Sequence, residues 1–216
     1  KGELNIFSFS NIRNRYLQSI ISFAQSYPGI KIQHTIAAPS NIFDYLATTP
    51  ASVGFCMRYY LLEGVPEMGT YIPTEFKFIR LAKQKLAVYC SKDNFLAQEY
   101  KSMSLKKITD MPIILYKPFI EEDYRLKELF FKLTNQELNI QYSVGELELF
   151  FSLLENTNCI NISAYFSQFK ERDNLCRIPI NDGIYQEFGI VYNKNAINIP
   201  AVKIFLEIVK KQYQNS

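Results

Sequence analysis

One order of elements, strand–helix–strand–helix–strand, is predicted twice in this chain of 216 residues, and it limits the possible folds more than any other feature. The first run covers residues 4–57 and the second covers residues 112–162, although their sequences are not similar. Strands that alternate with helices form parallel sheets with right-handed crossovers. We therefore predict an α/β protein of two Rossmann-like lobes with central parallel or mixed sheets. No Pro- or Ser-rich linker separates the lobes, so two crossover strands, Lys85–Cys90 and Phe188–Tyr192, are expected to join them.

The segment Leu4–Tyr16 (LNIFSFSNIRNRY) is predicted to run from a buried strand directly into a helix. Its apolar start is typical of a strand that is covered on both faces. Ser8, Ser10 and Asn11 follow where the helix begins, and these residue types accept hydrogen bonds from unpaired backbone N–H groups there. Because ligands of open α/β sheets bind at the carboxyl ends of strands, near helix starts, we expect a ligand site to begin at these three residues.

The predicted binding cleft lies where four such strand-to-helix turns converge. Backbone N–H groups and hydroxyls at helix starts suit an anionic group, Lys117 adds a positive charge, and tyrosines supply apolar walls with a polar tip. The alternative is that the serines are plain helix caps, each of which stabilises its helix by roughly 1 kcal/mol. Ser143, for example, is expected to cap a helix that starts at Val144. The residues predicted to bind the ligand are Ser8, Ser10, Asn11, Pro39, Ser40, Asn41, Tyr116, Lys117, Tyr142, Ser143 and Tyr165.

The composition argues against several classes of protein. The net charge is only +3 and the basic residues are scattered, which disfavours this segment as the main contact with nucleic acid. No apolar run approaches the roughly 20 residues of a membrane-spanning helix, and no secretory signal stands at the start, so a cytoplasmic protein without a membrane contact is expected. The four cysteines are far apart and form no CxxC pair, which favours buried free thiols over a disulfide or a metal set.

The titratable residues offer no obvious catalytic set. His34 is the only histidine, and its place on the apolar side of a predicted strand favours a satisfied, partly buried ring over a catalytic base. The acidic run Glu121–Asp123 has metal-ligating groups, but acids are favoured in the first turn of a helix because of its dipole. No P-loop or GxGxxG motif occurs. We therefore predict no catalytic residue, no metal and no cofactor.

Several short stretches, taken in order, resemble the effector-binding domain of LysR-type transcriptional regulators. Phe23–Ile32 (FAQSYPGIKI) resembles the family's helix that ends in Tyr/Phe-Pro-x-Val-x-Leu. Asp93–Ala97 resembles its His-Pro-Leu-Ala turn, and Ser104–Ile114 resembles its stretch Ser-Leu-x-x-Leu followed by Pro-x-Ile. Ala51–Phe55 lacks the Asp that is usual in the family at that strand, so the effector of relatives that keep the pattern is not carried over.

The resemblance implies a type 2 periplasmic-binding-protein-like fold in which residues 1–86 and 190–216 form lobe I and residues 87–189 form lobe II. It implies a sensor, not an enzyme, that binds a small molecule carrying a carboxylate or another anionic group between the lobes. DNA would be bound only through an N-terminal winged helix-turn-helix, which is absent from this chain.

The resemblance also implies a homodimer, or a tetramer of the full-length protein, in which Ile12–Ser26 and Ile30–Thr35 of one copy face Val144–Glu155 of another. Two other functions stay open. An extracellular solute-binding receptor of a transport system shares the fold and would be a monomer. An enzyme on the same fold would need an acid/base set in the cleft, where the sequence offers Glu146, Glu148 and Lys117.

Overall fold

The structure, a computed structural model, describes residues 2–8, 13–38, 41–62, 71–116, 121–164 and 172–214. Within this part of the chain, no helix is long and apolar enough to cross a membrane. The chain divides into two compact units: the first comprises Lys1–Arg58, Thr70–Lys83 and Glu187–Ser216, and the second comprises Tyr59–Gly69 and Gln84–Gln186. The lobe limits given by the sequence resemblance stay a prediction. Three of the four points where the chain changes unit lie in strands, namely in β3 (Ser52–Leu62), β4 (Phe76–Lys85) and β10 (Ile184–Asn193).

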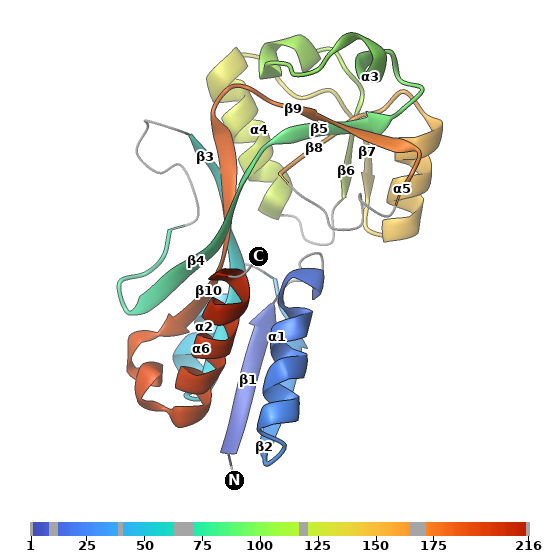
Figure 1. The fold of residues 1–216 in the computed structure, drawn as a ribbon. Coiled ribbons are helices and arrows are strands. Elements are labelled where there is room, and N and C mark those ends of the chain that lie inside the picture. The colour runs from blue at the N-terminus through green and yellow to red at the C-terminus, as the bar shows by residue number, and fades with distance from the viewer. Residues whose placement is uncertain are drawn as a thin grey trace. The chain divides into compact units, whose positions relative to one another are not determined.

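The first unit is built on a five-stranded sheet with the strand order β2-β1-β3-β10-β4. Strand β1 pairs in parallel with β2 and with β3, and Ser8 lies beside Ile36 at the carboxyl ends of β1 and β2. Helices α1 and α6 lie side by side (Figure 1), joined by a hydrogen bond from the buried Ser19 hydroxyl to Gln212. The remaining elements of this unit are β1 (Gly2–Ser8), α1 (Arg13–Ser26), β2 (Ile30–Ile36), α2 (Ile42–Thr48), η5 (Lys194–Asn198) and α6 (Pro200–Gln214).

An aromatic core ties the helices of the first unit to its sheet. Phe55 of β3 stacks on Tyr16 of α1, with ring centroids 4.5 Å apart, and on Phe188 of β10 at 5.9 Å. Phe205 of α6 meets Phe55 edge-on at 6.2 Å and meets Phe23 of α1 edge-on at 5.4 Å. None of the five rings is more than 2% exposed. Each such burial stabilises the fold by about 1.5–3 kcal/mol, so this cluster is a main source of stability in the unit.

Strand β2 is an edge strand, and it is less buried than its alternating sequence predicts. Ile30 and Ile32 are half-buried, whereas His34 is exposed and Ile36 is 56% exposed. The expected half-buried strand is therefore wrong for its carboxyl half. Because an edge strand has a neighbour on one side only, its side chains are covered only where another element packs over them.

The second unit contains a three-stranded antiparallel sheet, ordered β8-β5-β9, and a parallel pair formed by β6 and β7. The apolar face of α5, with Phe150, Phe151 and Leu154 fully buried, packs on these strands (Figure 1). The elements of this unit are β5 (Ala87–Ser91), α3 (Phe95–Glu99), η3 (Leu105–Ile108), β6 (Ile113–Tyr116), α4 (Glu121–Thr134), β7 (Ile140–Val144), α5 (Leu147–Asn156), β8 (Asn161–Ser163) and β9 (Leu175–Pro179).

Three local predictions are wrong. The turn residues Gly64, Pro66 and Gly69 predict a loop over Arg58–Thr70, but strand β3 continues to Leu62, because the apolar and aromatic run at 59–62 favours extended backbone. The expected strand Lys85–Cys90 is divided between the end of β4 and most of β5. Ser143 does not cap a helix, since it lies inside β7 and α5 begins only at Leu147.

A buried carboxylate holds two arginines in the first unit. Glu187 of β10, whose side chain is 7% exposed, is 3.0 Å from Arg58 of β3 and 3.0 Å from Arg80 of β4. A buried charge is stable only when it is paired and hydrogen-bonded, and two guanidinium groups satisfy both carboxylate oxygens here. The triad therefore links three neighbouring strands next to the points where the chain changes unit.

Gly189 of β10 is a position where the backbone passes close to its neighbours. An added Cβ would meet the ring of Phe78 and would lie 2.5 Å from the carbonyl oxygen of Ile79, whereas a Cβ at Gly29 would meet nothing within 4 Å. We expect Gly189→Ala to lower the free energy of unfolding by about 1–3 kcal/mol through overpacking. Gly29→Ala should change it by less than about 0.5 kcal/mol. Urea unfolding curves of both variants test this, and equal midpoints would contradict the close packing.

Candidate functional site

Three polar side chains meet near the carboxyl end of β1 in the first unit. The Ser8 hydroxyl oxygen lies 2.6 Å from the Tyr16 hydroxyl and 2.9 Å from Nε2 of His34. The Tyr16 hydroxyl lies 3.1 Å from the same ring nitrogen. Ser8 is the last residue of β1, Tyr16 lies near the start of α1, and His34 lies on β2. These three residues are called the hydroxyl–histidine cluster below.

The members of this cluster differ in their contact with solvent. Ser8 is fully buried and Tyr16 is 2% exposed, whereas His34 as a residue is exposed. Partial burial of its ring lowers the pKa of His34 below the usual value, since a buried imidazolium loses hydration. The ring is therefore neutral at neutral pH, and its Nε2 can accept a hydrogen bond from either hydroxyl. The expectation of a satisfied histidine agrees with these two contacts.

A second set of predicted residues lies on the parallel pair of the second unit. Ile114 of β6 stands opposite Tyr142 of β7, and Tyr116 stands opposite Val144 at the carboxyl ends of the strands. Both tyrosines are half-buried and pack on the core around Phe150, with the Tyr116 ring 5.7 Å from that of Phe150. Both tyrosines therefore contribute to the packing of this core, and their contact with a ligand stays a prediction.

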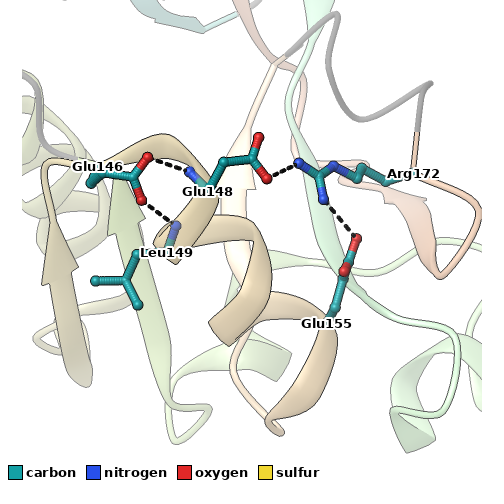
Figure 2. Close-up of polar contacts among 5 residues, drawn as sticks. All are labelled: Glu146, Glu148, Leu149, Glu155 and Arg172. Carbon is teal, nitrogen blue, oxygen red and sulfur yellow. Dashed lines mark hydrogen bonds and ion pairs between the residues drawn. The ribbon is translucent and has the colours of Figure 1, made fainter.

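A glutamate between β7 and α5, not the predicted serine, caps the start of α5. Figure 2 shows Glu146, not Ser143, at the start of α5, where its carboxylate accepts hydrogen bonds from the backbone N–H groups of Glu148 at 2.9 Å and Leu149 at 2.6 Å. These hydrogen bonds lower the pKa of Glu146. Ser143 is exposed and does not have the capping role that was predicted for it.

An arginine lies over the outer side of the same helix. Arg172 is 2.6 Å from the carboxylate of Glu148 and 3.9 Å from that of Glu155, as Figure 2 shows. Its guanidinium also stacks over the ring of Phe151, 4.6 Å from the centroid. A cation held by two carboxylates and an aromatic face is part of the packing of α5 and is not available as an anion-binding charge.

The predicted ligand residues thus have three different outcomes. Ser8 and Asn41 lie in the first unit, and Asn41 precedes α2 without a capping hydrogen bond from its side chain. Tyr116, Tyr142 and Ser143 lie together in the second unit. Their convergence with the first set stays a prediction. Outside the described residues lie Ser10, Asn11, Pro39, Ser40, Lys117 and Tyr165.

Sequence reasoning missed Tyr16 and the role of His34 in this cluster. The three- and four-residue spacing of Ile12, Tyr16, Ile20 and Phe23 predicts that Tyr16 lies on the apolar face of a helix, and His34 is expected to be structural, so neither belongs to the predicted site. A partial signal was present, since His34 is the polar exception among the isoleucines expected on one side of β2. The cluster becomes visible only when the pairing of β1 with β2 and the packing of α1 bring His34 and Tyr16 to Ser8.

His34 provides a test of the cluster that depends on pH. Its pKa is lowered in the folded chain, so below about pH 6.5 the unfolded chain binds a proton that the folded chain resists. The free energy of unfolding should therefore fall as the pH drops below this value and should be fully restored above it. We expect His34→Gln to lose this part of the pH dependence, measured by urea unfolding between about pH 5 and 7.5.

Thr35→Ala, an exposed change on the same strand, is the control and should keep the wild-type pH dependence. Superimposable profiles for wild type and His34→Gln would show that the imidazole does not sit in the environment described above.

The sequence matches the model of the LysR substrate binding domain over residues 1–214. Comparison with curated proteins finds no match. Among solved structures, the effector binding domain of BenM with its effector benzoate has a TM-score of 0.78 and 17% sequence identity, covering 100% of this chain and 93% of that chain. The effector binding domain of QuiR in complex with shikimate has a TM-score of 0.75 and 18% identity, covering 99% of this chain and 98% of that chain.

Full-length CbnR complexed with its target DNA is also similar, with a TM-score of 0.69 and 17% identity, covering 98% of this chain and 68% of that chain. At these identities the structural likeness shows the fold alone. It confirms the predicted α/β fold class of the type 2 periplasmic-binding-protein kind. Because the family match spans nearly the whole chain, this chain belongs to the LysR substrate-binding domain family, as its sequence resemblance predicted.

Proposed function

We propose that this chain is the effector-sensing domain of a LysR-type transcriptional regulator and that it binds a small anionic molecule at the hydroxyl–histidine cluster of its first unit. The observation that carries the proposal is the hydroxyl–histidine cluster at the carboxyl end of β1. In α/β sheets, ligands bind at the carboxyl ends of strands. The structurally similar domains of BenM and QuiR are described with benzoate and shikimate, and both of these ligands carry a carboxylate.

Within the cluster, the three residues have different tasks in this proposal. Ser8 and Tyr16 are buried, so they position the imidazole, while His34 is the member that is exposed to a ligand. The neutral, polar cluster fixes orientation by hydrogen bonds, and the charge of the anion is met by backbone N–H groups at the predicted helix starts. The half-buried tyrosines of β6 and β7 belong to the second unit, where they are a separate candidate for contact with a ring-shaped acid.

The same cluster brings a serine and a histidine within hydrogen-bond distance, which is also the geometry of an activated nucleophile. Two observations favour binding over catalysis. Ser8 is fully buried, and its hydroxyl is already shared with Tyr16. Among the described residues, no carboxylate is hydrogen-bonded to His34 to orient it as a base. We therefore favour a sensor without enzymatic activity.

A sensor of this kind acts through its whole protein. The ligand shifts the balance between two arrangements only to the extent that it binds one of them more tightly. In this proposal the shift alters how a DNA-binding domain outside this chain binds its operator. Because such a protein acts on DNA, the proposal also includes a cytoplasmic location. The complex of full-length CbnR with its target DNA supports a role of this kind in a regulator that binds DNA.

Thermal unfolding in the presence of organic acids tests the proposal. Benzoate, shikimate and inorganic phosphate are the first probes, followed by a wider set of carboxylates. A ligand at about 100 times its Kd should raise the free energy of unfolding by roughly 2.7 kcal/mol, which is a rise of several degrees in Tm. We expect Ser8→Val and His34→Leu to abolish that rise when each variant is compared with its own ligand-free Tm.

The control is Ser26→Ala, an exposed serine at the end of α1, which should keep the full rise. A rise that survives both cluster variants would place the ligand elsewhere. If no anion in the set raises Tm, the anionic ligand class is wrong.

We also propose that the domain forms a homodimer, with α1 and β2 of one copy against β7 and α5 of another. Apolar side chains are exposed on these elements: Leu17 is 43% exposed and Ile21 is 38% exposed on α1, and Ile36 is 56% exposed on β2. Leu149, 48% exposed, lies on α5. The outer edge of an edge strand has backbone groups that a second chain can pair with, and exposed apolar side chains beside it favour such docking.

Light scattering after size exclusion measures the state of the 25.2 kDa chain. We expect twice that mass for wild type and the single-chain mass for the double variant Leu17→Glu/Ile21→Glu, because two buried charges are not tolerated in an apolar interface. Phe131→Glu, at a 52% exposed position on α4 outside the proposed interface, should remain a dimer. A monomeric wild type, or a double variant that remains dimeric, would contradict the interface.

A further inference from the structure

Two of the four cysteines lie opposite each other in the second unit, although the chain separates them widely. Cys90 of β5 is paired with Cys176 of β9 in the antiparallel register, between the pairs Tyr89–Arg177 and Ser91–Leu175. The two sulfur atoms are 3.4 Å apart. Residues that face each other across antiparallel strands have Cα atoms roughly 4.5–5.5 Å apart, which is within the range that a disulfide spans.

The two thiols have different surroundings. Cys90 is fully buried, whereas Cys176 is only partly buried. The hydrogen bond from the Cys90 thiol, together with the positive charge of Lys92, lowers the pKa of Cys176 to about 7. The same contact and burial raise the pKa of Cys90. The accessible sulfur of Cys176 is therefore the more readily deprotonated of the two.

The other two cysteines are unlike this pair. Cys56 is buried, and burial raises its pKa to about 12. Cys159 is also buried, and its sulfur is 3.8 Å from the amide oxygen of Gln141. Neither faces another cysteine among the described residues, so both are expected to be inert towards oxidants.

We propose that Cys90 and Cys176 form a peroxide-sensitive dithiol that closes reversibly to a disulfide between β5 and β9. The oxidant is a small hydroperoxide that reaches the partly exposed Cys176, and the adjacent, buried Cys90 resolves the product. This modification site lies within the antiparallel sheet of the second unit and is independent of the anion site proposed above.

The chemistry balances in two steps. The Cys176 thiolate attacks one peroxide oxygen, the O–O bond breaks, and the departing hydroxide takes a proton to leave as water while Cys176 becomes a sulfenic acid. The Cys90 sulfur then attacks the Cys176 sulfur, an S–S bond forms and the S–O bond breaks. The second hydroxide takes the Cys90 proton and leaves as water. Two thiols are oxidised and one hydrogen peroxide is reduced to two waters.

Formation of the disulfide should raise the thermal stability of the chain. The disulfide would connect residues 90 and 176, so that most of the second unit lies within the closed loop. Cross-links that close long loops restrict the unfolded chain and stabilise the folded one. The oxidised chain should therefore melt several degrees above the reduced chain.

The test is oxidation of the purified, fully reduced chain with a small excess of hydrogen peroxide, followed by alkylation under denaturing conditions. We expect two of the four thiols to be protected from alkylation, the intact mass to fall by two hydrogen atoms, and a peptide map to join Cys90 to Cys176. Dithiothreitol should restore all four thiols and the lower Tm.

Variants separate the pair from general oxidation. Cys176→Ala should leave Cys90 fully alkylatable after peroxide, and Cys159→Ala, which removes a buried thiol outside the pair, should still form the cross-link. If Cys90→Ala does not fold, the peptide map of the wild type and the Cys176→Ala variant decide the question without it. The proposal is overturned if all four thiols stay reduced, if Cys176 gains oxygen atoms while Cys90 stays free, or if the cross-link joins two chains.

Discussion

The contacts of Tyr16 hold together the part of the first unit on which its candidate site depends. The ring of Tyr16 stacks on Phe55 in the core, while its hydroxyl lies within hydrogen-bond distance of both Ser8 and His34. One side chain thus anchors α1 to the sheet and also arranges the polar groups at the end of β1. Burial of the ring fixes the position of the hydroxyl, and the hydroxyl in turn is one of the two side-chain partners of the buried Ser8.

In the second unit, charged side chains contribute to the placement of α5. The α5 helix buries its phenylalanines, and its exposed start and outer side are held by Glu146 and Arg172. These ionic contacts are partly exposed, so each contributes little on its own compared with the buried apolar face. Their effect is local: the cap ends β7 and begins α5 at a defined residue, which leaves Tyr142 on the side of the core.

A sensor needs polar groups that are satisfied before a ligand arrives and that can still be reached by it. The hydroxyl–histidine cluster meets the first condition with three mutual contacts and meets the second through His34. The Cys90–Cys176 pair is a separate chemical feature on different strands. The two proposals together give the chain two independent responses to small molecules, one through binding and one through oxidation.

Much of the fold was predictable from local sequence, because apolar periodicity is a property of neighbouring residues. Apolar spacing predicts helices at 12–26, 121–133 and 201–213, and these correspond to α1, α4 and α6 within a residue or so at each end. The family membership was also predictable, since short motifs keep their order along the chain. Predictions were wrong at the ends of elements, as at β3, which continues beyond Arg58.

The sequence by itself determined the alternation of strands and helices, the apolar faces and the presence of serines and tyrosines at strand ends. It did not determine which polar groups meet. Ser8, Tyr16 and His34 come together, as do Cys90 and Cys176, only when strand register and helix packing bring them within hydrogen-bond distance. Register is set by the burial of whole strand faces, which is a sum over many residues far apart in sequence, so no local pattern predicts such a contact.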